Sequence, residues 1–97
     1  MTFTKQDLPK DIVRYAKVWG AIFKMTHPNW KSQKGYVLDE WRSRGDYDIN
    51  LFCEDGYLSV CVYKQTTDDL GDIVTDYDYF VRVVQEQDKN VHRRYED

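Results

Sequence analysis

The sequence has little of the chemistry that most enzymes and metalloproteins carry. Its two cysteines stand eight residues apart, its two histidines are isolated and its five glycines are scattered, so neither a zinc-ligand pattern nor a glycine-rich phosphate loop occurs. No apolar run approaches the roughly 20 residues of a membrane span, and the N-terminus lacks the layout of a signal peptide. We therefore expect a cytoplasmic protein with no catalytic residues, no cofactor, no bound metal and no membrane contact.

The 97 residues suffice for one small domain, and we expect residues 1–97 to form it without a linker. The charges are unevenly distributed along the chain. Residues 1–38 hold seven basic and two acidic side chains, whereas residues 39–80 hold eleven acidic and three basic ones. Such asymmetry in a small fold predicts one strongly charged face, which bears on binding partners more than on stability.

The clearest structural signal is a β-hairpin over residues 46–65 that turns at Asp55-Gly56. An Asp-Gly pair suits a two-residue type I′ turn, because both turn positions need a positive φ. The turn fixes a register with four predicted pairs: Glu54 with Tyr57, Cys53 with Leu58, Leu51 with Val60, and Ile49 with Val62. The apolar members of these pairs then share one face, and the other face holds Asp48, Asn50, Phe52, Glu54, Ser59, Cys61 and Tyr63. Because the two cysteines fall on opposite faces, we expect two free thiols.

Residues 9–25 are predicted to form an amphipathic helix. Pro9 fits its first position, Asp11 favours the positive end of the helix dipole, and apolar residues recur at spacings of three and four. Gly20 weakens the helix interior by roughly 1 kcal/mol relative to alanine, and a close approach of another element would explain its use. Pro28 ends the helix, because it disfavours helical geometry at the preceding residue.

Strands are predicted at about 36–42, 46–54 and 57–65, with a short helix as the alternative for residues 36–44. Thr75 and the acids after it can begin a second helix that reaches about residue 94, with apolar residues spaced for one face at Tyr77, Val81, Val84, Val91 and Tyr95. The aromatic and β-branched run 79–84 also permits a fourth strand over residues 72–84. The expected fold is α+β, with an N-terminal and a C-terminal helix packed on a three-stranded antiparallel β-meander.

The acidic stretch of residues 65–81 contains five aspartates and neither lysine nor arginine. Carboxylates two residues apart on one strand face lie about 6.6–7 Å apart, which is comparable with the spacing of successive phosphates in nucleic acid. A groove that normally holds DNA would be attracted to such a face, and tyrosine supplies rigid contact area beside it. The predicted partner-binding residues are Asp48, Glu54, Asp68, Asp69, Asp72, Asp76, Tyr77, Asp78 and Tyr79.

The length, the compact α/β pattern, the acidic stretch TTDDLGDIVTDYDY and the lack of a catalytic signature resemble small phage-encoded anti-CRISPR proteins. The chain is most similar in outline to type I-F inhibitors that imitate DNA. This resemblance implies a monomeric, non-enzymatic inhibitor in the cytoplasm of the host cell. Its implied partner is the type I-F CRISPR surveillance complex, at the basic groove where that complex grips target DNA, and it implies no direct binding of nucleic acid.

Two other functions fit parts of the chain. The basic side chains of the first helix and the loop after it, with Trp30 nearby, favour a small phage or plasmid regulator that binds nucleic acid, although the net charge of −3 opposes this reading. Asp68, Asp69 and Asp72 suggest an enzyme with an acidic metal site, although the glycine-centred calcium loop with its distal glutamate is absent.

Overall fold

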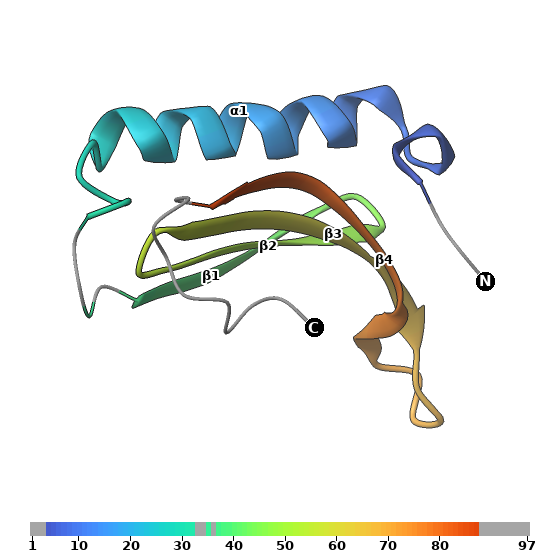
Figure 1. Cartoon of the computed structure of the whole chain (residues 1–97). Helices are drawn as coiled ribbons and strands as arrows, with labels where there is room; N and C mark the ends of the chain where they lie inside the picture. The colour runs from blue at the N-terminus through green and yellow to red at the C-terminus, as the bar shows by residue number, and fades with distance from the viewer. Residues whose placement is uncertain (1–3, 33–34, 36, 88–97) are drawn as a thin grey trace.

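A long helix lies across a four-stranded antiparallel sheet in the computed structural model, which describes residues 4–32, 35 and 37–87 (Figure 1). The elements are a 3-10 turn η1 (Lys5–Asp7), helix α1 (Lys10–Thr26) and strands β1 (Val37–Arg44), β2 (Tyr47–Glu54), β3 (Tyr57–Thr67) and β4 (Ile73–Gln87). The strands lie side by side in chain order, so each hairpin joins two neighbours. The α+β class is confirmed, as is the strand reading of residues 36–44 from Val37 onward.

The central hairpin is the best-predicted part of the fold. Asp55 and Gly56 form its turn with φ values of 43° and 84°, the positive range that a type I′ turn requires. All four predicted pairs between β2 and β3 occur in the structure. The predicted helix also forms, ending at Thr26 just before His27 and Pro28.

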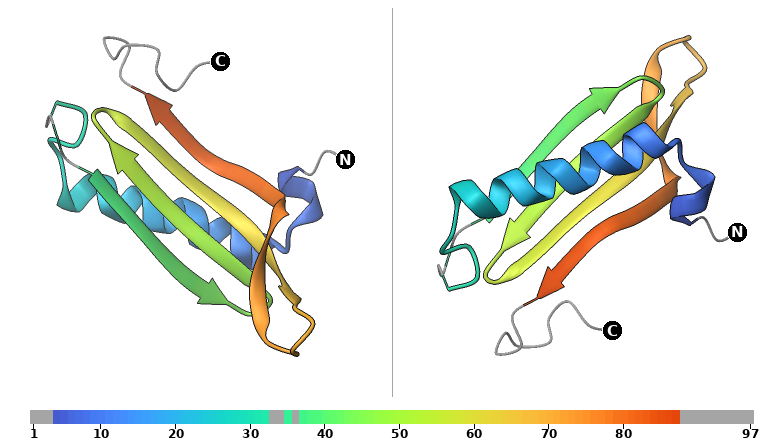
Figure 2. Two further views of the ribbon diagram at one scale, coloured as in Figure 1. Left: turned by 90° about the horizontal axis from the view of Figure 1, so that it is seen from below. Right: turned by 90° about the horizontal axis from the view of Figure 1, so that it is seen from above.

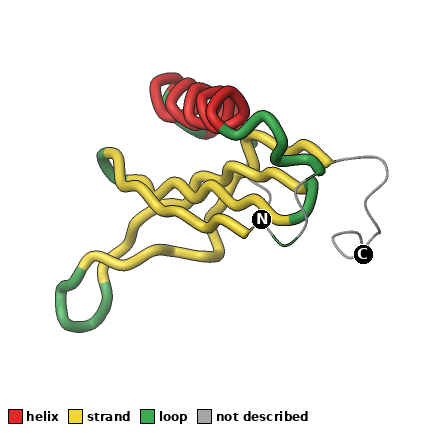
Figure 3. The backbone as a smooth tube through the Cα atoms, turned by 90° about the vertical axis from the view of Figure 1, so that its left-hand side faces the viewer, coloured by secondary structure: helices red, strands yellow, loops and turns green. Residues whose placement is uncertain are grey.

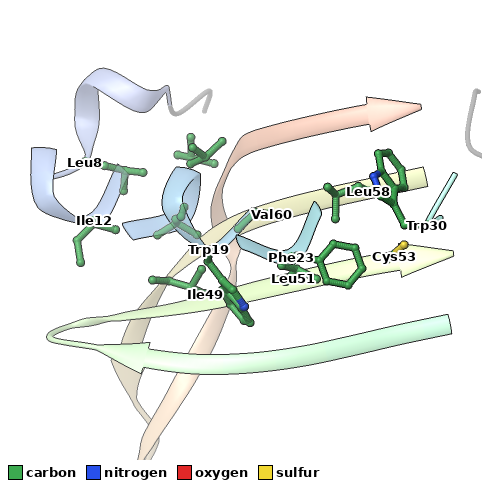
Figure 4. Packing of buried hydrophobic residues seen from close by; sticks show 14 residues of the cluster. Leu8, Ile12, Trp19, Phe23, Trp30, Ile49, Leu51, Cys53, Leu58 and Val60 are labelled. Carbon is green, nitrogen blue, oxygen red and sulfur yellow. The ribbon is translucent and has the colours of Figure 1, made fainter. Parts of the chain in front are cut away.

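The core lies between α1 and one face of the sheet (Figure 4). Alternate residues of β2 and β3 point toward the helix, because successive side chains of a strand face opposite sides. Ile49, Leu51, Leu58, Val60 and Val62 are each fully buried there. The helix contributes Ile12, Ala16, Trp19 and Phe23, and Leu8 and Trp30 close the two ends.

The second predicted helix is wrong: residues 73–87 form β4, which pairs antiparallel with β3. Thr75 therefore caps no helix, but lies opposite Gln65 in the ladder. The physical reason lies in β3, which runs through the buried middle of the sheet, so that its backbone N–H and C=O groups need a hydrogen-bonding strand on each side. The fourth-strand alternative for residues 72–84 describes the structure, whereas Val91 and Tyr95 lie outside the described residues.

The other face of the sheet is not covered by α1 (Figure 2, left). It carries Trp41 of β1, Asn50 and Phe52 of β2 and Tyr63 of β3, as strand alternation requires. Ser59 and Cys61 also belong to this face, yet both are buried although α1 does not cover them. This face is therefore exposed at Trp41 and half-buried or buried along β2 and β3.

Gly20 lies on the buried side of α1, close to Val60 of β3 and Val84 of β4. A Cβ atom at this position would lie 3.4 Å from Cγ2 of Val60 and 3.6 Å from Cγ2 of Val84, which is van der Waals contact. We expect Gly20→Ala to stabilise the protein by up to about 1 kcal/mol through helix propensity. Gly20→Val adds two further methyl groups to that Cβ atom at a filled position, and it should cost about 1–3 kcal/mol. Urea denaturation of both variants measures the difference, and equal stabilities would contradict the close contact.

The two thiols are free and buried, in agreement with the prediction. Burial raises the pKa of Cys53 to about 11, and the charge of Asp55 adds to this shift. Since the thiolate is the reactive form, iodoacetamide at pH 8 should leave native Cys53 unmodified. Unfolding in urea without a reductant should give two labels per chain by mass spectrometry. Rapid labelling of the native protein at Cys53 would contradict the burial.

Candidate protein-binding surface

The outer half of the β3–β4 hairpin bends away from the helix and projects from the sheet (Figures 1 and 3). Two irregularities in the β3–β4 pairing precede this projection. Val83 is the extra residue of the first, and residues 77–79 are extra in the second, because Tyr63 pairs with Phe80 while Lys64 pairs with Asp76. Such bulges bend a strand and increase its twist, so they carry the hairpin out of the plane of the sheet.

The turn of this hairpin is built around Asp68. One oxygen of its carboxylate accepts hydrogen bonds from the backbone N–H groups of Leu70 and Asp72, each at 2.9 Å. The backbone N–H of Asp68 donates to the carbonyl oxygen of Asp72 at 2.9 Å, and Gly71 takes a φ of 86°. Asp68 therefore shapes the turn, and its side chain is partly engaged there.

We call residues 68–78 the hairpin tip. Asp69, Asp72 and Asp78 are exposed in it, whereas Asp76 is half-buried and accepts a hydrogen bond from the backbone N–H of Asp78 at 3.0 Å. Large apolar side chains also face solvent here, most of all Leu70, which is 87% exposed, and Ile73, which is 71% exposed. The hairpin tip thus combines negative charge with apolar contact area and contributes nothing to the buried core.

The two predicted tyrosines lie on different sides of the strand. Tyr77 contacts Trp41 and Tyr63 on the uncovered face, with ring centroids 6.2 and 5.6 Å away. Tyr79 is half-buried on the helix side, where it packs against the core. The centroid of its ring lies 5.6 Å from Nζ of Lys64. The structure therefore brings only Tyr77 to the surface beside the aspartates.

Asp48 connects all four strands at the base of the hairpin tip. Its carboxylate accepts hydrogen bonds from Ser43 of β1 and Gln65 of β3, both at 2.9 Å, and from the hydroxyl of Thr75 in β4. Partial burial would by itself raise the pKa of Asp48. The three donors outweigh this effect and hold the pKa below its ordinary value. This predicted partner-binding residue therefore has a structural role.

Glu54 is not part of the same surface. It pairs with Tyr57 beside the β2–β3 turn, whereas Asp48 pairs with Tyr63. The six residue steps from Tyr57 to Tyr63 span about 20 Å at about 3.3 Å per residue. The predicted acidic residues thus form a group at the hairpin tip, Asp48 at its base and Glu54 at the far end of the sheet.

The sequence reasoning missed an aromatic group on the uncovered face, formed by Trp41, Tyr63, Tyr77 and Phe80. The rings of Trp41 and Tyr63 lie 5.3 Å apart, and those of Tyr63 and Phe80 lie 5.8 Å apart. Strand alternation alone could have placed Trp41 and Tyr63 on one face once β1 was aligned with the hairpin. The contribution of β4 depends on its irregular pairing, which no local pattern encodes.

Several basic side chains of α1, the loop after it and β1 already contact other residues of the protein. Lys24 forms an ion pair with Glu86 of β4, and Nζ of Lys31 lies 5.4 Å from the ring centroid of Trp30. Trp30 itself is buried, so it cannot stack on a nucleotide base. Arg42 likewise lies over the ring of Trp19, with 4.1 Å from its guanidinium carbon to the centroid.

Across the described parts of the chain, no three histidine, cysteine, aspartate or glutamate side chains gather in a way that could hold a metal ion. Asp68, Asp69 and Asp72 are thus neighbours in the turn without forming such a group. No helix among these residues is long and apolar enough to cross a membrane. Comparison with protein-family models, with characterised proteins and with solved structures finds no match.

The position of Asp48 predicts a pH-dependent contribution to stability. Because the folded-state pKa lies below the unfolded value, the carboxylate stabilises the fold above about pH 4, and this stabilisation is lost as the pH falls through the folded pKa. We expect Asp48→Asn to cost about 1–3 kcal/mol at pH 7, since hydrogen bonds to a charged group are lost. Urea denaturation between pH 7 and pH 2.5 should show the variant approaching the wild type as the pH falls.

Glu40→Gln serves as the control for this prediction. Glu40 is exposed on β1, so its substitution should change stability by no more than about 0.5 kcal/mol at neutral pH. A cost for Asp48→Asn that is the same at every pH would show that its ionisation is not linked to folding.

Proposed function

We propose that the protein is a stoichiometric inhibitor that inserts its hairpin tip into a basic, nucleic-acid-binding groove of a partner complex. The observation that carries this proposal is the projection of residues 68–78 from the sheet, with exposed aspartates around exposed apolar side chains. A tip that makes no core contacts is available to a partner without disturbing the fold. Its action requires no catalytic group.

The charge of the hairpin tip supports a basic partner. Five aspartates lie within residues 68–78 and no lysine or arginine does, so the local field is strongly negative. A groove lined with arginine and lysine is attracted to such a tip by the same forces that hold nucleic-acid phosphates. Leu70 and Ile73 would add apolar contact, which simple charge mimicry lacks.

The partner that follows from the sequence resemblance is the type I-F CRISPR surveillance complex. In this proposal the hairpin tip competes with target DNA for the groove in which that complex binds it. The alternative regulator that uses a basic first helix has less support, because Lys24 is paired with Glu86 and Trp30 is buried. Arg14 and Lys17 are exposed on the helix, but an ordinary solvent-facing helix carries such residues as well.

The proposal predicts that Asp69→Asn with Asp72→Asn abolishes most of the binding. Each carboxylate that faces a desolvated arginine or lysine contributes about 2 kcal/mol or more, so affinity should fall by several hundredfold, at tenfold per 1.4 kcal/mol. The measurement is calorimetric affinity for the purified surveillance complex, together with its occupancy by target DNA. Circular dichroism should show an unchanged fold, since both side chains are exposed.

Asp11→Asn with Glu40→Gln is the matched control, because it removes the same number of negative charges from exposed positions off the hairpin. This control should bind as the wild type does. An equal loss in both double variants would indicate a net-charge effect and contradict a specific role for the tip. Unchanged inhibition by the Asp69 and Asp72 variant would refute the proposed function.

A further inference from the structure

Four aromatic side chains gather on the uncovered face of the sheet, where Tyr77 of the hairpin tip meets three rings outside the tip. We call them the aromatic cluster: Trp41, Tyr63, Tyr77 and Phe80. Three of them form a triangle, with centroid distances of 5.3 Å from Trp41 to Tyr63, 6.2 Å from Trp41 to Tyr77 and 5.6 Å from Tyr63 to Tyr77. They come from β1, β3 and β4, so the fold itself assembles them.

The aromatic cluster is accessible to solvent. Trp41 is 44% exposed, Phe80 is 45% exposed and Tyr77 is 65% exposed, although the chain has buried positions for its other two tryptophans. Contiguous exposed rings at one site are typical of an interaction surface, because they offer large and rigid contact area. A structural role alone would not leave so much of these rings in water.

Two carboxylates accompany the aromatic cluster. Asp39 lies two residues before Trp41 on the same face of β1, and Asp48 lies directly opposite Tyr63. Neutral groups hold both: the amide of Asn50 donates to Asp39, and Ser43, Gln65 and Thr75 donate to Asp48. Because these donors are neutral, they orient the two carboxylates without neutralising their negative charge.

The charge on this part of the sheet therefore selects a cation. Arg82, which pairs with Cys61 on the same face, is the basic residue near the aromatic cluster in the described strands. Burial raises the pKa of the Tyr63 phenol, with Cys61, Tyr77 and Asp39 adding to the shift and Arg82 opposing it, so the ring stays neutral. Two carboxylates and one guanidinium leave the site net negative.

We propose that the aromatic cluster binds an arginine side chain of the partner protein. The guanidinium lies over the exposed ring of Trp41 or Tyr77 by a cation–π contact, with its N–H groups directed toward the carboxylate of Asp39. Arginine fits better than lysine, since its planar group stacks on a ring and forms two parallel hydrogen bonds with one carboxylate. Single-stranded nucleic acid also stacks on aromatic rings, but its phosphates need a positive groove.

This inference names the chemistry of a second contact beside the hairpin tip, and it rests on the proposed function only for the identity of the partner. The test therefore uses a short arginine peptide, hexa-arginine, with hexa-lysine and a thymidine hexanucleotide for comparison. To remove binding at the tip, it is carried out in the Asp69→Asn, Asp72→Asn background. Failure of the proposed function then leaves the outcome of this test unaffected.

Intrinsic fluorescence provides the readout, because Trp19 and Trp30 are buried at 6% and 4% exposure while Trp41 is accessible. Hexa-arginine should protect Trp41 from acrylamide quenching with a saturable dependence on its concentration. Hexa-lysine should bind about tenfold more weakly. The thymidine hexanucleotide should give no protection.

Two variants locate the binding. Tyr77→Leu keeps apolar bulk but removes the ring, and Asp39→Asn removes the charge; each should weaken hexa-arginine binding by about tenfold. Met25→Ala is the control, because Met25 is also an exposed apolar side chain but lies on α1 away from this face. Equal binding of the two peptides with no effect of Tyr77→Leu would overturn the inference, as would protection by the hexanucleotide. Protection that rises with protein concentration alone would indicate self-association and overturn it too.

Discussion

One helix can cover only one face of a four-stranded sheet, and this constraint organises the described part of the molecule. The side chains of β2 and β3 alternate strictly, so the apolar set faces α1 and the polar and aromatic set faces away. A chain of 97 residues has enough apolar surface for about one such interface. The second face of the sheet is thereby available for contacts with other molecules.

The same strand supplies both the core and the proposed binding surface. β4 buries Val81 and Val83 beside the helix, then presents Phe80 and Tyr77 on the uncovered face and leads into the hairpin tip. The two bulges make this change of role possible, because each extra residue reverses which side of the sheet the following side chains face. Local irregularity in the pairing therefore places the side chains of the proposed binding surface beside a regular core.

The central hairpin could be predicted residue by residue because its turn chemistry and its alternation indicate the same register. β4 could not, and its bulges explain why. Val81 pairs with Val62 and Val84 with Val60, so two side chains three residues apart both face the helix, where a regular strand would space them by two. The extra Val83 thus produces helical spacing within a strand, and the prediction of a second helix followed this misleading period.

The candidate site, too, could be predicted from the sequence only in part. The aspartates of the hairpin tip were evident from composition, since five of them lie in one stretch without a basic residue. The structural role of Asp48 was not evident, because its donors come from three other strands. The aromatic cluster likewise depends on the alignment of β1, β3 and β4, which tertiary pairing determines.

The separation of the hairpin tip from the core has a consequence for how this protein can change over generations. Substitutions at Asp69, Leu70 or Ile73 alter no buried contact, so their effects on stability should be small and should add independently of substitutions under the helix. In the proposed function, these exposed side chains can therefore change to suit an altered binding groove while β2 and β3 stay as they are. Asp68 and Gly71, which shape the turn, would stay fixed, and the proposed recognition could then evolve at the exposed positions between them at little cost to folding.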